Sequence, residues 1–127
     1  MEPTRRPPLG LPGWNDQAAV ALLVLVAGHL CATESVPLTP DRLARVVGAY
    51  HDDLPALVAA LADSPSAPVR HGALHLRRLI RAGQAGVYQR VMPGIPVALA
   101  DPYFRLALFK AAARAGLDLF PPARCGR

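Results

Sequence analysis

Residues 54–83 read LPALVAALADSPSAPVRHGALHLRRLIRAG, and this stretch decides the predicted fold. Its first part is almost wholly apolar, a Ser-Pro-Ser turn follows at 64–66, and an apolar stripe with helical spacing continues nearly to the end. Gly83 is typical of a helix C-terminus, because glycine adopts the left-handed conformation there without a steric penalty. We therefore predict one helix to about Ala62 and a second over about 67–82, folded back on each other.

Helix signals continue on both sides of this stretch. Further helical segments are predicted at about 16–33, 40–50, 84–92 and 102–115. The first of these is apolar all the way round the helical wheel, so we expect it to be the buried central helix. Pro96 is expected to keep residues 93–101 irregular or only partly helical. Because the sequence lacks sustained period-two alternation, the predicted fold class is all-α, a compact bundle of about five to six helices arranged as antiparallel helical hairpins.

The length of 127 residues fits one domain with a single core. We expect the folded part to span 14–118, after a Pro-rich arm at 1–13 that carries Arg5 and Arg6, and before a tail at 119–127. Apolar residues make up 52% of the chain, which argues against a disordered protein.

The apolar run from Ala18 to Ala27 invites comparison with a signal peptide, because two arginines precede it. Pro-rich sequence and Asn15-Asp16 separate the arginines from the run, and no clean cleavage site follows. The run is also shorter than the ~20 residues that cross a bilayer, so we expect no membrane span. Two cysteines do not make a disulfide framework, and Cys31 is predicted to be a buried thiol. We expect a cytoplasmic protein.

Charge is divided unequally between the two halves of the chain. Residues 1–63 carry 4 basic and 7 acidic residues, a net charge of −3, whereas residues 64–127 carry 10 basic and 2 acidic residues, a net charge of +8. A basic half favours an anionic partner, which can be an acidic protein surface, a nucleic acid or an anionic lipid.

The stretch 52–116 resembles a HEAT-type helical repeat. The match is carried by LPALVAALAD at 54–63, the Pro-containing turn, and the Val69-Arg70 pair that opens the second helix. A looser second copy follows, in which MPGIPVALAD at 92–101 precedes another helix that ends in Arg-Ala-Gly. The resemblance implies stacked antiparallel helix pairs used for binding and implies no active site. Because two repeats alone are rarely stable, the N-terminal helices would have to cap the stack.

Residues 40–62 show a second pattern, the spacing of a helix-turn-helix DNA-binding unit. The pattern rests on Ala44, Gly48, Leu54, Val58 and Leu61. Its would-be recognition segment, 50–63, contains Asp52, Asp53 and Asp63 and no lysine or arginine. Phosphate contacts supply most of the affinity for DNA, so this segment would repel it.

The predicted helix over 67–82 has the cleanest division of faces. On a helical wheel its apolar residues fall within one arc, and the other arc contains Arg70, His71, Leu74, His75, Arg77, Arg78 and Arg81. This second arc contains the candidate partner-binding residues, because the helix has no acidic residue to pair with its arginines. A plain solvated face is the competing interpretation. Pairing with Asp52, Asp53 and Asp63 of the same chain is another, and it would neutralise the face.

Candidate chemistry elsewhere is sparse. His71 and His75 have a spacing that metal ligands use, but the neighbouring arginines would repel a cation, so we predict no metal site and no cofactor. The sequence contains no glycine-rich phosphate loop and no nucleophile within a recognisable motif, so we predict no enzymatic activity. Trp14 is expected to pack against the domain.

We therefore predict a non-enzymatic adaptor or regulatory module whose basic helix engages an acidic protein. The first alternative is nucleic-acid binding through the same face, aided by Arg5 and Arg6, and the second is a helix-turn-helix regulator that uses 40–62. Tyr103, Phe104 and Phe109 of the last helix are expected in the core or on a partner-facing patch. That helix has few polar residues, so another copy or a different chain is expected to cover its outer face.

Overall fold

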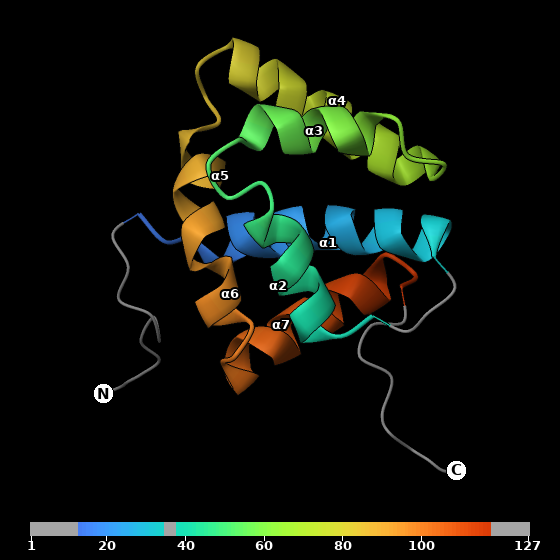
Figure 1. Cartoon of the computed structure of the whole chain (residues 1–127), viewed down its shortest axis with the longest axis vertical. Coiled ribbons are helices and arrows are strands. Elements are labelled where there is room, and N and C mark those ends of the chain that lie inside the picture. The colour runs from blue at the N-terminus through green and yellow to red at the C-terminus, as the bar shows by residue number, and fades with distance from the viewer. Residues whose placement is uncertain (1–12, 35–37, 118–127) are drawn as a thin grey trace.

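The computed structural model describes residues 13–34 and 38–117 (Figure 1). Within these ranges the chain forms α1 (Asp16–Thr33), α2 (Pro40–Gly48), α3 (Leu54–Ala62), α4 (Ala67–Arg81), α5 (Gly86–Val91), the 3-10 turn η1 (Met92–Gly94), α6 (Ile95–Ala98) and α7 (Pro102–Arg114). These ranges contain helices and no strand, which confirms the predicted all-α bundle. The predicted tail and almost all of the predicted arm lie outside the described residues.

Helix starts are fixed by short polar side chains that accept hydrogen bonds from the first turn. Asn15 Oδ1 accepts from the amide of Ala18 at 3.0 Å, and Asp53 Oδ1 accepts from the amide of Ala56 at 3.0 Å. Asp101 and Thr39 cap α7 and α2 in the same way. An uncapped first turn leaves backbone N–H groups without partners, so these residues set where each helix begins.

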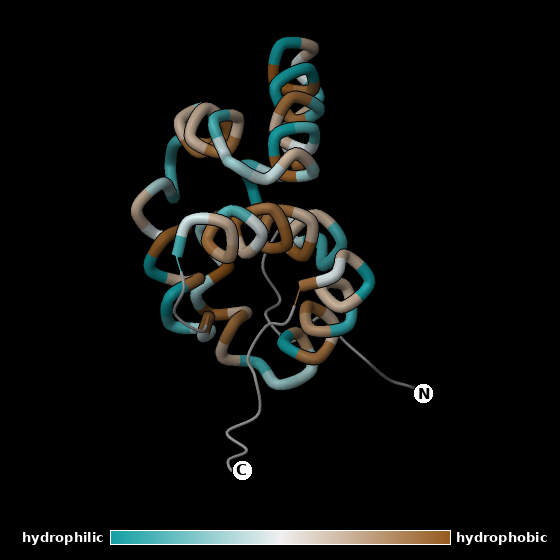
Figure 2. The backbone as a smooth tube through the Cα atoms, turned by 90° about the vertical axis from the view of Figure 1, so that its right-hand side faces the viewer, coloured by the Kyte–Doolittle hydropathy of each residue, from teal (hydrophilic) through white to brown (hydrophobic). Residues whose placement is uncertain are grey.

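The helices are arranged around α1. In Figure 1, α3 and α4 form an antiparallel hairpin on one side of α1, and α7 lies on the other side. Helix α2 packs against both α1 and α6. Figure 2 shows hydrophobic residues concentrated along the central helix and mixed with hydrophilic ones along α4, at the top of that view.

The segment between α4 and α7 is partly helical. Residues 86–98 form one bent helical path through α5, η1 and α6, and 99–101 lie outside the helices, in agreement with the expectation that 93–101 would be irregular or only partly helical. Pro93 and Pro96 each fall at the start of a new short element, where the missing N–H has no helical partner to lose. Met92 and Ile95 are buried, so tertiary packing stabilises these short turns.

Burial of α1 is one-sided. Leu22, Leu23 and Val26 are buried, and eight of the 18 residues of α1 are, so the predicted central helix is buried on one side and only partly covered on the other. Cys31 is exposed rather than buried. By length and composition alone α1 is apolar enough to cross a membrane, and the absence of a membrane span stays a prediction. Trp14 packs against Phe104 of α7 with ring centroids 5.7 Å apart.

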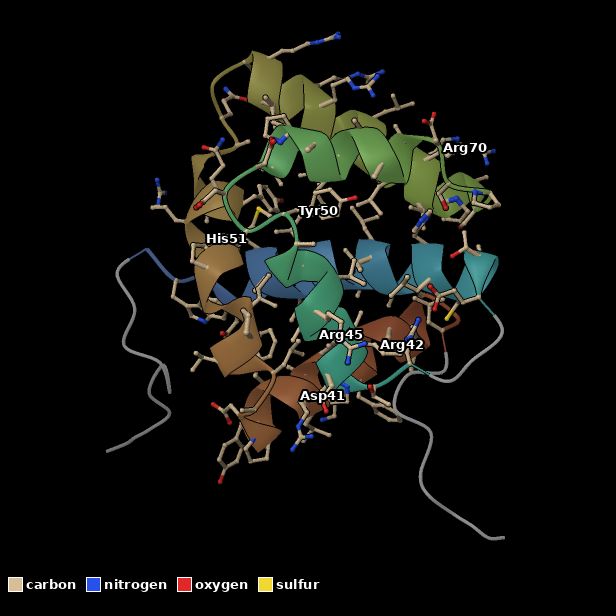
Figure 3. The ribbon with its side chains drawn as sticks, viewed as in Figure 1. Asp41, Arg42, Arg45, Tyr50, His51 and Arg70 are labelled. Atoms are coloured by element: carbon tan, nitrogen blue, oxygen red, sulfur yellow. The ribbon has the colours of Figure 1, made fainter. Side chains whose placement is uncertain are left out.

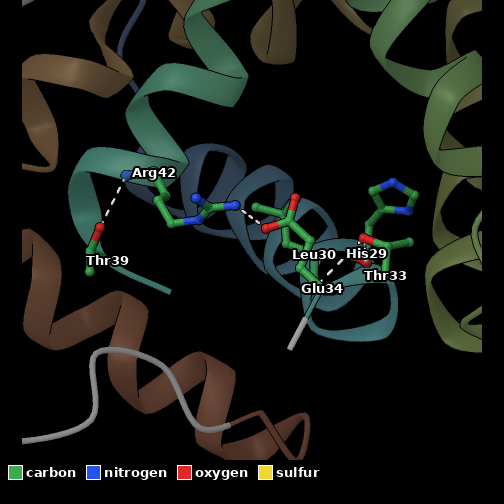
Figure 4. A network of polar contacts seen from close by, with 6 residues as sticks. All are labelled: His29, Leu30, Thr33, Glu34, Thr39 and Arg42. Carbon is green, nitrogen blue, oxygen red and sulfur yellow. Dashed lines mark hydrogen bonds and ion pairs between the residues drawn. The ribbon is translucent and has the colours of Figure 1, made fainter. Parts of the chain in front are cut away.

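The end of α1 is tied to α2 by side-chain contacts (Figure 4). Arg42 of α2 forms an ion pair with Glu34, which follows α1 directly. Thr39 Oγ1 accepts a hydrogen bond from the Arg42 amide at 3.2 Å, so the residue that forms the ion pair also lies in the capped first turn. Thr33 Oγ1 donates a hydrogen bond at 3.0 Å to the carbonyl oxygen of His29, which lies one turn earlier in α1.

Candidate functional site

Helix α4 begins and ends at signals present in its own sequence. Ser66 Oγ accepts a hydrogen bond from the amide of Val69 at 3.5 Å, and Pro68 occupies the first turn. At the other end Gly83 has φ of +70°, and the amide of Gln84 donates to the carbonyl oxygen of Leu79 at 2.8 Å. This closing pattern satisfies carbonyl groups that the last turn would otherwise leave unpaired.

One face of α4 is packed and the other is open. Val69, Ala73 and Leu76 are buried against α3 and α1. Gly72 permits the close approach to α1, because a Cβ atom there would lie 2.5 Å from Leu25 Cδ2. This contact fixes the rotation of α4 about its axis, so its remaining residues are turned toward α3 or toward solvent.

The seven predicted surface residues differ in exposure. Five are exposed: His71, Leu74, His75, Arg78 and Arg81. Arg77 is half-buried, and so is Arg70. Leu74 is 41% exposed and lies among these polar side chains as an isolated apolar group. We call the five exposed residues together with Arg77 the basic face.

Arg70 is held by the hairpin turn rather than presented to solvent (Figure 3). Its Nη1 donates to the carbonyl oxygen of Ser64 at 2.8 Å and to that of Pro65 at 3.0 Å. Ser64 is only 1% exposed, so the guanidinium supplies a partner to a carbonyl that little water reaches. The geometry makes Arg70 a turn-stabilising residue, although the helical wheel placed it with the binding residues.

The acidic residues near the hairpin are not paired with the basic face. Asp52 Oδ2 lies 2.8 Å from Nε2 of the adjacent His51, and Asp53 caps α3. Among residues 13–34 and 38–117 the close contacts between acidic and basic side chains are this one and Glu34–Arg42. Within the described chain, Asp63 therefore forms no ion pair with an arginine of α4. The alternative in which the three aspartates neutralise the face lacks the contacts that it requires.

Helices α2 and α3 show where the helix-turn-helix pattern falls. Leu54, Val58 and Leu61 are buried, and α3 packs along α4 as the first half of the hairpin. The outer side of α3 presents Pro55 and Ala59, which have no polar side-chain atoms for contacts with phosphates or bases. The pattern therefore coincides with the packing spacing of the hairpin.

His71 and His75 lie one turn apart on exposed positions of α4. The described residues contain no group of three or more His, Cys, Asp or Glu side chains placed to hold a metal ion. The prediction that the chain binds no metal stays a prediction.

A second surface feature, which the helical wheel of α4 did not indicate, is a groove along α1. It is an open hollow of about 440 Å³ between α1, α4 and α5, and it adjoins a hollow of about 370 Å³ between α1 and α7. Its floor is the uncovered stripe of α1: Val20, Ala21, Val24 and Leu25. The sequence signal was that α1 is apolar on every side, whereas its neighbours cover only part of it.

Helix α7 divides its aromatic residues between core and surface. Phe104 is buried, whereas Tyr103 is 81% exposed and Phe109 is 40% exposed. Leu106 is 52% exposed and lies between them. Phe104 therefore lies in the core, and the outer side of α7 contains exposed apolar side chains beside Lys110. That another chain covers this side stays a prediction.

No protein-family model, curated protein or solved structure matches this chain.

Proposed function

We propose that the chain is a non-enzymatic adaptor or regulatory module that engages an acidic protein surface through the basic face of α4. The observation that supports this proposal is the set of exposed cations on that face without an ion pair in the described chain. Arg78 and Arg81 are exposed, and α4 contains no acidic residue. Unpaired surface arginines can meet a partner without first breaking an internal contact.

The composition of the face suits a protein partner. Arginine forms bidentate hydrogen bonds to carboxylates, which gives both charge and geometric selection. Leu74 adds an exposed apolar group between the cations, and interfaces between proteins combine such groups with arginine. A partner with Asp or Glu around an apolar pocket would match this arrangement.

The test is charge reversal on the full chain. The double variant Arg77→Glu/Arg78→Glu is compared with Arg45→Glu/Arg90→Glu, which reverses equal charge at exposed positions on α2 and α5. Proteins captured by the wild-type chain from its own cell extract are identified and then purified for binding titrations. We expect binding to the α4 variant to fall by about tenfold or more and binding to the control to change little, because interface charges act locally. Unchanged binding of every captured protein to the α4 variant would contradict the proposal.

A second candidate is nucleic-acid binding through the same face. It is favoured by the net charge of +8 on residues 64–127. Basic side chains that neutralise phosphates release counterions, and this gives affinity for nucleic acid of any sequence. This candidate predicts retention of RNA or duplex DNA on filters at low salt, with an affinity that falls steeply as salt is added. If neither is retained at about 0.05 M salt, where screening is weak, this candidate is removed.

A further inference from the structure

One stripe of α1 contains apolar side chains that neighbouring helices cover only in part. Val20, Val24 and Leu25 are half-buried and Ala21 is exposed, although each lies on the central, predominantly apolar helix. From Gln17 to Leu25 the stripe runs about 12 Å along α1, at a rise of 1.5 Å per residue. That length matches about two turns of a second helix laid along the groove.

The walls of the groove come from helices on both sides of α1. On one side Gly72, His75 and Leu76 of α4 border it, and on the other Lys110 and Ala111 of α7 do. The two hollows share Gln17, Val20 and Ala111, so they form one continuous surface. An open trough with an apolar floor is the form that recognises an amphipathic helix.

The charged residues that line the groove indicate which kind of partner it would bind. Neither α4 nor α7 contains an acidic residue, and Lys110 and Arg114 lie at the groove. Asp16 is the acidic residue at one end, and its Oδ1 already accepts a hydrogen bond from Trp14 Nε1. The α7 side of the groove is therefore basic, whereas the α4 side contributes Gly72, His75 and Leu76. An occupant with acidic residues on the flank of its apolar stripe that faces α7 is complementary.

A second copy of this chain fits less well. The exposed apolar side chains Tyr103 and Leu106 of α7 themselves line the hollow that contains Lys110 and Arg114. Two copies that met through this surface would bring cations against cations, and like charges across an interface are unfavourable.

We propose that this groove is the docking site for an acidic amphipathic helix of a partner protein. The partner helix would place apolar side chains at i, i+3 or i+4, and i+7 over Val20, Ala21 and Val24, with Asp or Glu facing Lys110 and Arg114. This inference rests on the proposed function in one respect only: both take the partner to be an acidic protein. It uses the floor of α1, which the basic face does not include.

The probe is a displayed library of helical peptides of about 18 residues, long enough for marginal helicity in water, with randomised positions. Selection against the full chain is expected to enrich peptides with an apolar i, i+4, i+7 stripe and acidic residues on at least one flank. The most enriched peptide is then synthesised with a fluorescent label, and its affinity is measured by anisotropy. Enrichment of no peptide above background, or of peptides without acidic flanks, would overturn the proposal.

Matched variants place the peptide in the groove. Ala21→Glu puts a carboxylate on the floor, and Ala59→Glu makes the same change at an exposed position of α3. We expect Ala21→Glu to weaken the peptide by about tenfold or more, because a buried unpaired charge is costly, and Ala59→Glu to change it by less than about twofold. If Ala21→Glu fails to fold, Lys110→Glu/Arg114→Glu carries the comparison, with the same loss expected.

The other outcomes separate the occupants and the two proposals. A peptide that binds Ala21→Glu as well as it binds the wild-type chain overturns the groove assignment. So does sedimentation that shows a wild-type dimer absent from Ala21→Glu, or phosphatidylserine vesicles bound by the wild-type chain and not by this variant. If cellular partners are lost on Arg77→Glu/Arg78→Glu while the peptide is still bound at the groove, the two sites are distinct and both proposals stand. If Ala21→Glu leaves the peptide unaffected and the α4 variant loses it, only the proposed function stands.

Discussion

Replacement of Arg70 by alanine should destabilise the α3–α4 hairpin without acting on the basic face. Arg70 Nη1 lies 2.8 Å from the carbonyl oxygen of Ser64 and 3.0 Å from that of Pro65. Alanine removes both contacts. The Ser64 carbonyl then lies in a position that solvent barely reaches, since Ser64 is 1% exposed. The turn that joins the two helices would contain an unpaired acceptor.

The size of the effect follows from the charge and the exposure of the donor. Hydrogen bonds to charged groups contribute about 1.5–3 kcal/mol each, and these two share one nitrogen atom of a half-buried side chain. We therefore take the low end, and expect the free energy of unfolding to fall by about 1.5 kcal/mol. With a urea dependence of about 1–3 kcal/mol per molar for a small domain, the unfolding midpoint should fall by about 1 M.

The assay uses the tryptophan that the chain already contains. Trp14 is the single tryptophan, and it packs against Phe104 of α7, so its fluorescence should change when the bundle unfolds. Arg78→Ala is the matched control, because Arg78 lies on the same helix but is exposed. We expect the control to stay within about 0.5 kcal/mol of the wild-type chain.

The reasoning is refuted by either of two results. The first is a midpoint for Arg70→Ala that equals the wild-type midpoint, which would mean that the turn does not depend on the guanidinium. The second is an equal loss for Arg78→Ala, which would mean that removal of any arginine from α4 destabilises the domain. Either result would return Arg70 to the group of candidate binding residues.

Three further substitutions test the packing and the helix ends. Leu108→Ala should lower the free energy of unfolding in urea by about 3 kcal/mol, because Leu108 is fully buried. The control Leu106→Ala, at a 52% exposed position on the same helix, should lower it by less than about 0.5 kcal/mol. Equal losses would contradict the assignment of Leu108 to the core. Gly83→Ala should lower stability by about 1 kcal/mol, because φ there is +70°, and an unchanged melting temperature by circular dichroism would exclude that strain. Asp53→Ala should cost about 1 kcal/mol by removing the cap of α3, and thermal melts that superimpose on the wild-type curve would show that the cap contributes nothing.

Helix positions were predictable because their signals are local. Asn15, Thr39, Asp53 and Asp101 each cap a helix, and a cap needs only the next three residues of sequence. The bent path over 86–98 was harder to predict, because two prolines argue locally against a helix. Burial of residues on both sides of them decides the outcome, and burial depends on the rest of the fold.

The candidate surface was predictable only in part, for the same reason. The wheel of α4 separated buried Val69, Ala73 and Leu76 from the cations, because helical periodicity is a local property. It could not show that Arg70 contacts the turn carbonyls, since that depends on how the hairpin closes. It could not show the groove either: the sequence of α1 contains apolar residues on all sides, and only the positions of α4 and α7 determine which side stays open.

Several acidic side chains in the first half of the chain have specific structural contacts. In the first half Asp53 caps a helix, Glu34 contacts Arg42 and Asp52 contacts His51, so these carboxylates have partners within about ten residues of sequence. None of these contacts involves a residue of α4. The macrodipole of α4 favours cations in its last turn, which accounts for Arg78 and Arg81 in terms of stability alone. The macrodipole of α7 accounts in the same way for Arg114 in its last turn, whereas Lys110 lies before that turn. Lys110 borders an apolar floor on α1, and an acidic helix would complete this arrangement.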